Sequence, residues 1–129
     1  MFETFSARVV HMGPAGAGQR AKLFNNALML MKMRAIADIL TLATDTGTDV
    51  RALADALRSG SAASRALDLL GTMIRPDTAD HLADVLVLDM KIFATAMIDA
   101  GAHPQTTERV IASGLAGARR LTDTVRLLG

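Results

Sequence analysis

A lysine and two asparagines stand near the start of the longest helix that the sequence predicts. Lys22 and Asn26 are four residues apart and share one helical face, and Asn25 lies about 100° around the axis from Asn26. A cation gains nothing from the positive end of a helix dipole, which favours anions. A lysine, carboxamide donors and a helix N-terminus together suit a substrate carboxylate or a developing oxyanion. The residues leave two interpretations open: this anion site, or a solvated lysine beside asparagines that bond between helices.

The segment before these residues contains the dinucleotide-binding pattern G-x-G-x-x-G/A, as GAGQRA at 16–21. In a dinucleotide site this pattern joins a strand to a helix, and an acidic residue about 20 positions on ends a second parallel strand. RVVH (8–11) could be the first strand, but Asp38, at the expected distance, lies in the middle of a helical pattern. The sequence therefore argues against a dinucleotide-binding fold built on this pattern.

The composition indicates one mainly helical domain. Half of the 129 residues are hydrophobic, only 3% are aromatic, and the helix-forming residues Leu, Ala and Met dominate the apolar content. A net charge of +1 gives no electrostatic case for nucleic acid or an anionic membrane. The absence of cysteine excludes disulfides, thiolate metal sites and a cysteine nucleophile. We expect no metal site, because the three histidines have no metal-ligand spacing with one another or with carboxylates.

The sequence gives no sign of a membrane protein. No signal peptide is recognisable, and the most apolar stretch, 27–43, is interrupted by Lys32, Arg34 and Asp38. We therefore expect a cytoplasmic protein.

Apolar residues at helical spacing predict an all-α bundle of five to six helices. The first helix, 17–46, is apolar around nearly its whole circumference, so we expect it to be the central element and to be shared with another domain or subunit. Gly47 is the predicted stop, and Thr48 or Asp49 the cap of the next helix. The later helices are expected at 50–59, at 62–74, from Asp77 or Thr78 to a stop at Gly101, and from Pro104 to Leu128 with a weak point near Gly114 and Gly117.

The junction VVHMGPAGAGQRAKLFNN resembles that of the β-hydroxyacid dehydrogenases, the superfamily of 3-hydroxyisobutyrate dehydrogenase, tartronate semialdehyde reductase and 6-phosphogluconate dehydrogenase. In that superfamily a GxGxxxKxxxN motif opens a long interdomain helix, and Gly16, Gly18, Lys22 and Asn26 match it position for position. Weaker matches continue along the chain. They are the helix break at 47–49, the Ser/Gly turn at 59–64, the lysine of LVLDMK, and AGAHP.

The resemblance implies roles for several residues. Lys22 would exchange a proton with the substrate oxygen during hydride transfer, and Asn26 would bond the substrate. Removal of a lysine from water between two domains would suit it to proton transfer. Gly16 and Gly18 would let the backbone approach the NAD or NADP cofactor, and Lys91 would lie near the nicotinamide.

Two of the sites that the resemblance implies have competing interpretations. Ser59, Gly60 and Ser61 fall where family members have a substrate-contacting loop, but a plain helix-connecting turn explains them equally well. Lys91 is also explained as a solvated lysine, and Ile92 stands where the family usually has an aspartate.

The resemblance also implies a domain organisation. Residues 1–15 would be the end of a nucleotide-binding domain whose main part lies upstream, and residues 16–129 the C-terminal helical domain for substrate binding and oligomerisation. Alone, this chain is expected to bind no cofactor tightly. The alternative is a non-catalytic helical oligomerisation module derived from the family. A homodimer is expected in either case, through an exposed flank around Met29, Met33 and Ile36.

Overall fold

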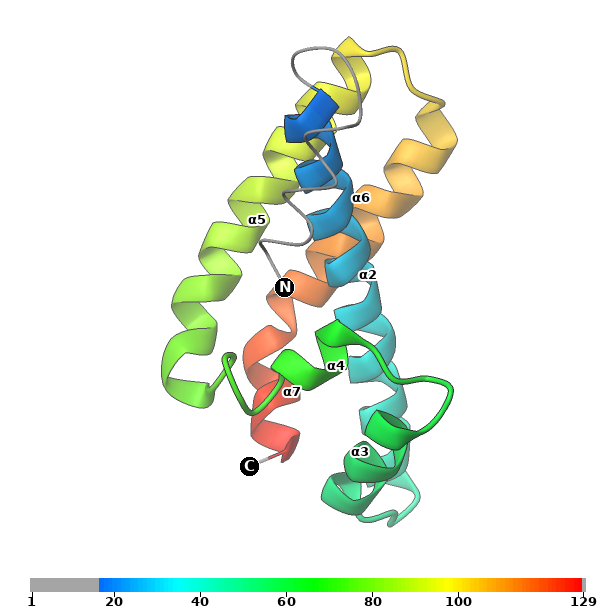
Figure 1. Cartoon of the computed structure of the whole chain (residues 1–129), viewed down its shortest axis with the longest axis vertical. Coiled ribbons are helices and arrows are strands. Elements are labelled where there is room, and N and C mark those ends of the chain that lie inside the picture. The colour runs from blue at the N-terminus through cyan, green and yellow to red at the C-terminus, as the bar shows by residue number, and fades with distance from the viewer. Residues whose placement is uncertain (1–16, 129) are drawn as a thin grey trace.

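The computed structural model describes residues 17–128, which form six helices (Figure 1). These are α2 (Ala17–Asp45), α3 (Val50–Ser59), α4 (Arg65–Leu69), α5 (Pro76–Asp99), α6 (Pro104–Arg119) and α7 (Leu121–Leu128). No strand is present among them, so the all-α prediction is confirmed. The predicted strand at 8–11, the segment 1–15 and Gly16 lie outside the described residues.

Helix α2 is the centre of the bundle, as its wide apolar surface predicts. Its 29 residues extend about 43 Å, and it contacts each of the other five described helices. Leu30, Met33 and Leu40 are almost completely buried along it. None of the described helices combines the length and the hydropathy needed to cross a membrane.

The predicted boundaries at the end of α2 are confirmed. Gly47 adopts a φ of 73°, the left-handed conformation that commonly follows the last turn of a helix. Asp49 is the cap of α3, because its carboxylate accepts a hydrogen bond from the Ala52 N–H at 3.1 Å. Gly101, with a φ of 72°, ends α5 in the same way.

The third predicted helix, at 62–74, is much shorter than expected. Ser64 caps α4 by accepting from the Leu67 N–H at 3.1 Å, and α4 ends after only five residues. The backbone then turns at Gly71, whose N–H donates to the Ile74 carbonyl at 2.8 Å. This turn allows both Leu70 and Ile74 to enter the core, at 0% and 3% exposure.

The predicted weak point at Gly114 and Gly117 is wrong, because α6 continues through both residues. Both glycines are buried where α6 crosses its neighbours. A Cβ at Gly117 would overlap the Leu30 carbonyl oxygen and lie 3.1 Å from the Arg34 nitrogen, so the glycine is what lets the α2 and α6 backbones meet.

The chain breaks instead at Arg120, between α6 and α7. Its guanidinium donates to the Asp38 carboxylate and, at 3.1 Å, to the Thr41 hydroxyl. The α6–α7 junction is thereby tied to the middle of α2.

The apolar flank predicted around Met29, Met33 and Ile36 is also wrong. Met33 is only 2% exposed, and Met29 and Ile36 pack against the core. The large apolar side chains that α2 does expose lie elsewhere on the helix: Phe24, Leu28, Ile39 and Leu42, at 49–59% exposure.

Candidate functional site

The motif residues occupy the first turns of α2. Gly18 lies in its first turn, Lys22 is exposed, and Asn26 is half-buried one turn further on. The buried alanines Ala21 and Ala27 fix this end of the helix to the bundle. The four-residue spacing therefore presents the ammonium and the carboxamide on one face of the helix.

An aromatic contact packs the N-terminal part of α2 against α5. Phe24 and Phe93 pack edge to face, with centroids 6.0 Å apart and an interplanar angle of 76°. Lys22 and Lys91 each precede one of these rings by two residues, and two residues turn a helix by about 200°. Because α2 and α5 run in opposite directions (Figure 1), the two lysines lie about one helical turn apart along the bundle, each on a helix side turned away from the ring contact.

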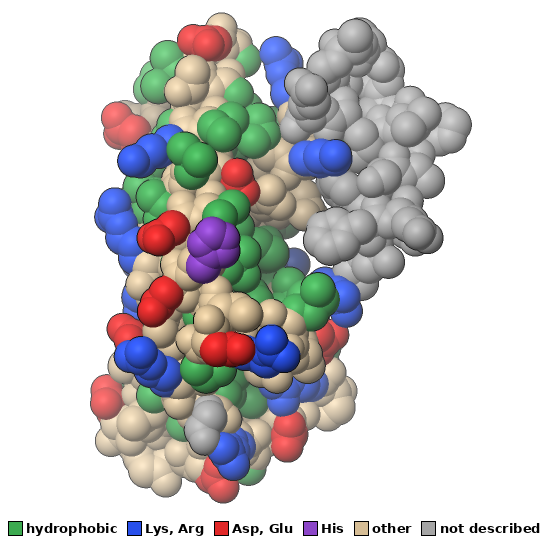
Figure 2. All heavy atoms as spheres, turned by 90° about the vertical axis from the view of Figure 1, so that its left-hand side faces the viewer, with side chains coloured by type: hydrophobic (Ala, Val, Ile, Leu, Met, Phe, Trp, Pro, Cys, Tyr) green, Lys and Arg blue, Asp and Glu red, His purple; other side chains and the backbone are tan. Residues whose placement is uncertain are grey.

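Lys91 lies at the edge of a shallow hollow on α5. The hollow measures about 430 Å³ and is lined by Lys91, Ile92, Thr95, Ala96 and Asp99. The side of the bundle on which α5 lies carries apolar side chains interleaved with charged ones (Figure 2). Among the described residues neither Lys91 nor Lys22 takes part in an ion pair.

The turn Ser59–Ser61 lies in another part of the molecule. It follows α3, which lies at the C-terminal end of α2, whereas Lys22 and Asn26 lie at the opposite end (Figure 1). The Ser59 hydroxyl donates to the Ala56 carbonyl at 3.1 Å, and the Gly60 N–H donates to the Leu57 carbonyl at 3.2 Å. Within one chain these residues are not brought together with Lys22, and their contact with a substrate stays a prediction.

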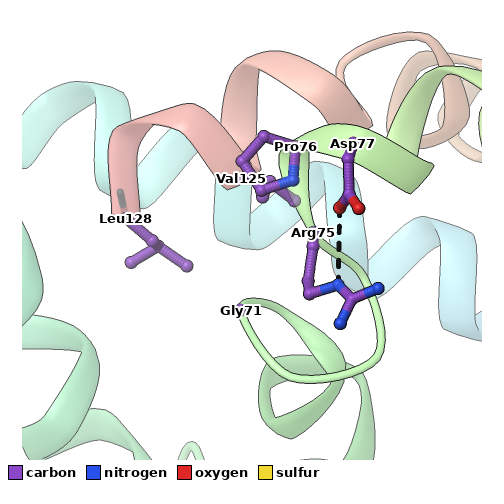
Figure 3. A pocket seen from close by; sticks show the side chains of 6 residues that line it. All are labelled: Gly71, Arg75, Pro76, Asp77, Val125 and Leu128. Atoms are coloured by element: carbon purple, nitrogen blue, oxygen red, sulfur yellow. Dashed lines mark ion pairs between the residues drawn. The ribbon is translucent and has the colours of Figure 1, made fainter.

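A larger hollow, which the sequence did not predict, opens between the start of α5 and α7 (Figure 3). It measures about 550 Å³ and is lined by Gly71, Arg75, Pro76, Asp77, Val125 and Leu128. The Arg75 Nε and the Asp77 carboxylate are 3.4 Å apart, so its two charged groups are paired with each other. Because Pro76 precedes Phe93 by 17 residues of α5, about 25 Å, this hollow is remote from the lysines.

The described residues contain no group of three His, Asp or Glu side chains arranged to hold a metal ion. Among the described residues, Lys22 and Asn26 place an amine and a carboxamide at the N-terminal end of α2.

Comparisons with known proteins agree with the motif. Residues 16–124 match the family described as NAD-binding of NADP-dependent 3-hydroxyisobutyrate dehydrogenase. An NAD-dependent L-serine dehydrogenase of Pseudomonas aeruginosa is 35% identical over 69 residues, which cover 54% of this chain and 23% of the relative. A probable 3-hydroxyisobutyrate dehydrogenase-like protein of Arabidopsis thaliana is 30% identical over 109 residues, or 82% of this chain and 34% of the relative.

A probable 3-hydroxyisobutyrate dehydrogenase of Mycobacterium tuberculosis is 35% identical over 57 residues, 44% of this chain and 19% of the relative. The chain thus spans about a third or less of each of these relatives. No solved structure shows significant similarity to it. The family match covers most of the chain, including Lys22 and Asn26, and the chain belongs to the NAD(P)-dependent 3-hydroxyisobutyrate dehydrogenase family.

Proposed function

We propose that this chain is the C-terminal domain of an NAD(P)-dependent dehydrogenase or reductase that acts on a small β-hydroxy acid or its semialdehyde. The observation that carries this proposal is the placement of the family motif. Lys22 and Asn26 lie on one face at the N-terminal end of α2, within the segment that matches the family. This end of α2 is held by buried alanines on one side and offers an exposed amine on another.

In the proposed reaction Lys22 exchanges a proton with the substrate oxygen. Its amine accepts the hydroxyl proton as the alcohol carbon becomes a carbonyl, and its ammonium returns the proton in the reverse direction. Asn26 donates a hydrogen bond from its carboxamide to the same substrate and orients it. When bound, NAD(P) supplies the hydride acceptor or donor.

Two of the described residues support a contact with such a cofactor. Gly18 lies in the first turn of α2, and a residue without a side chain would let the cofactor approach the backbone closely. Lys91 offers an exposed ammonium beside the Thr95 hydroxyl in the α5 hollow. We propose that Gly16 also contacts the cofactor. Because Lys22 is exposed, the proposed reaction requires a surface from outside residues 17–128 to shield it from water.

We expect the isolated chain to bind NAD or NADP only weakly. The lysines and Gly18 supply a few contacts, and no βαβ unit is present among the described residues to hold the dinucleotide. Isothermal titration of the 129-residue chain with each dinucleotide should therefore give no saturation at micromolar concentrations. The full-length polypeptide that contains the chain is the control. A micromolar dissociation constant for the isolated chain would overturn this expectation.

The second candidate function is a non-catalytic helical oligomerisation module. Ile92 favours it, because the family usually has an aspartate after this lysine and Ile92 is instead half-exposed in the α5 hollow. The sequence encoded immediately upstream of Met1 distinguishes the two candidates. An in-frame Gly-rich βαβ segment supports the dehydrogenase, and its absence supports the module. Both candidates include self-association of the helical domain.

A further inference from the structure

Helix α6 begins with an uncommon capping residue, a histidine. The N-cap of a helix is usually Ser, Thr, Asp or Asn, whose side-chain oxygen accepts a hydrogen bond from a backbone N–H of the first turn. Asp49 and Ser64 cap α3 and α4 in this way, each at 3.1 Å. At the start of α6 the acceptor is instead the His103 Nδ1, to which the Thr106 N–H donates at 3.2 Å. The first turn of α6 therefore depends on the lone pair of a ring nitrogen.

This hydrogen bond requires the neutral form of His103. A neutral imidazole has one acceptor nitrogen, whereas both nitrogens of the protonated ring are donors, so no rotation of a protonated ring restores the bond. The Thr106 hydroxyl lies 3.1 Å from the same Nδ1 and accepts a hydrogen bond from the Arg109 guanidinium at 3.4 Å. A permanent cation thus already occupies the other side of the Thr106 hydroxyl.

The surroundings of His103 do not compensate a charge on its ring. A positive ring at the N-terminal end of α6 meets the positive end of the helix dipole. The other ionisable side chains at this end of the bundle are exposed and come from three helices: Arg20 and Lys22 of α2, Asp99 of α5, and Glu108 and Arg109 of α6. Within residues 17–128, no carboxylate forms an ion pair with His103. A proton on His103 therefore removes an acceptor and adds a charge that the helix dipole repels.

The cap lies at a functionally relevant end of the bundle. The turn between α5 and α6 is at the end where α2 begins and where Lys22 lies (Figure 1). Within this turn Thr107 is only 9% exposed, and its N–H and hydroxyl donate to the His103 carbonyl at 3.0 and 2.9 Å. We propose that the first turn of α6 is a pH-sensitive element, which is ordered while His103 is neutral and loosens when His103 is protonated. This inference goes beyond the proposed reaction and does not rest on it.

Amide hydrogen exchange of the 129-residue chain, followed by NMR, tests this element directly. The measured quantity is the protection factor, the intrinsic exchange rate at a given pH divided by the observed rate. Histidine ordinarily changes its charge near about pH 6.5, so the comparison is made at about pH 7.5 and about pH 5. At the lower pH the protection of the Thr106 amide should fall roughly fivefold, the factor that corresponds to a typical N-cap. The Leu67 amide is the internal control, because the Ser64 hydroxyl that caps it does not titrate.

Three variants assign the effect to the cap. His103→Asn supplies a carboxamide oxygen that accepts at every pH, so the protection of the Thr106 amide should be the same at both pH values. His103→Ala has no acceptor, so the protection should be equally low at both. His81→Asn removes another exposed histidine, within α5, and should leave the fall seen in the wild type unchanged. Far-UV circular dichroism at both pH values checks that each protein remains folded.

The inference fails on any of three results. Equal protection of the wild-type Thr106 amide at both pH values would mean that the cap does not respond to protonation. The same fall in His103→Asn as in the wild type would assign the response to another group. An equal fall at the Leu67 amide would mean that acid loosens the whole bundle and not the first turn of α6.

Discussion

Replacing Lys22 by alanine in the proposed full-length dehydrogenase is expected to lower kcat by roughly 10²–10⁴-fold, the range typical for the loss of a proton-transfer group. Under the proposed mechanism the substrate hydroxyl would then have no amine to accept its proton, although the remaining contacts would still bind the substrate. KM should change much less than kcat, because the interaction that is lost develops mainly in the transition state. Steady-state reduction of NAD or NADP with a panel of small β-hydroxy acids measures both constants.

Lys32→Ala is the matched control for this variant. Lys32 is also an exposed lysine of α2, but it lies ten residues further along the helix and on another face. Its replacement removes the same charge from the same helix and should leave turnover unchanged. Equal losses in the two variants would mean that charge on α2, and not proton transfer by Lys22, matters for the reaction.

Gly117→Ala is expected to have the largest effect on stability. The new Cβ would overlap the Leu30 carbonyl oxygen and also press on the Arg34 nitrogen, which are backbone atoms of α2 and cannot move alone. Overpacking of this kind typically costs about 1–3 kcal/mol of the free energy of unfolding, and here the α2 and α6 helices would have to separate. Urea unfolding followed by circular dichroism measures the loss.

Gly114→Ala, on the same helix, separates this effect from helix propensity. The Cβ at this position meets the Met90 side chain, at 2.7 Å from Cε, and a flexible methionine tip can move. The gain of about 0.5–1 kcal/mol from replacing a helical glycine offsets this smaller clash. Gly114→Ala should therefore be close to neutral. If Gly117→Ala were equally neutral, the close crossing of α2 and α6 would be incorrect.

Local signals predicted most helix boundaries. Gly47, Asp49 and Gly101 act through their own backbone conformation or through a side chain that bonds within three residues, so the sequence is sufficient to place them. The third helix shows where local signals fail. Its apolar spacing fits a helix that continues to residue 74. The chain instead turns at Gly71, because this turn buries both Leu70 and Ile74 in the core.

The buried face of α2 could not be predicted from α2 itself. A helix that is apolar around most of its surface does not indicate which of its faces will be buried. In this protein the packing of α6 determines the buried face of α2. Gly117 brings the α6 backbone against Leu30 and Arg34, which turns Met33 into the core and leaves Phe24 and Leu42 outside. In the sequence, the same glycine is indistinguishable from a weak point in a helix.

The candidate site also has a part that the sequence predicts and a part that only tertiary packing determines. Lys22 and Asn26 could be paired from the sequence, because a four-residue spacing within one helix fixes their common face. The level of Lys91 relative to Lys22 depends on the packing of Phe24 on Phe93, a contact between residues 69 positions apart. The remoteness of the turn Ser59–Ser61 likewise depends on where α3 lies along α2, which no local pattern encodes.

Chemical rescue of Lys22→Ala tests most directly whether this chain supplies the proton-transfer lysine of a hydroxy-acid dehydrogenase. The measurement is the rate of hydroxy-acid-dependent NAD(P) reduction by the full-length variant, with and without added ethylamine. An amine that diffuses into the space left by Lys22 can accept the substrate proton, so the rate should rise with ethylamine concentration from a strongly reduced baseline. Turnover by Lys22→Ala as fast as the wild type, or a low rate that no amine restores, would contradict the proposed role.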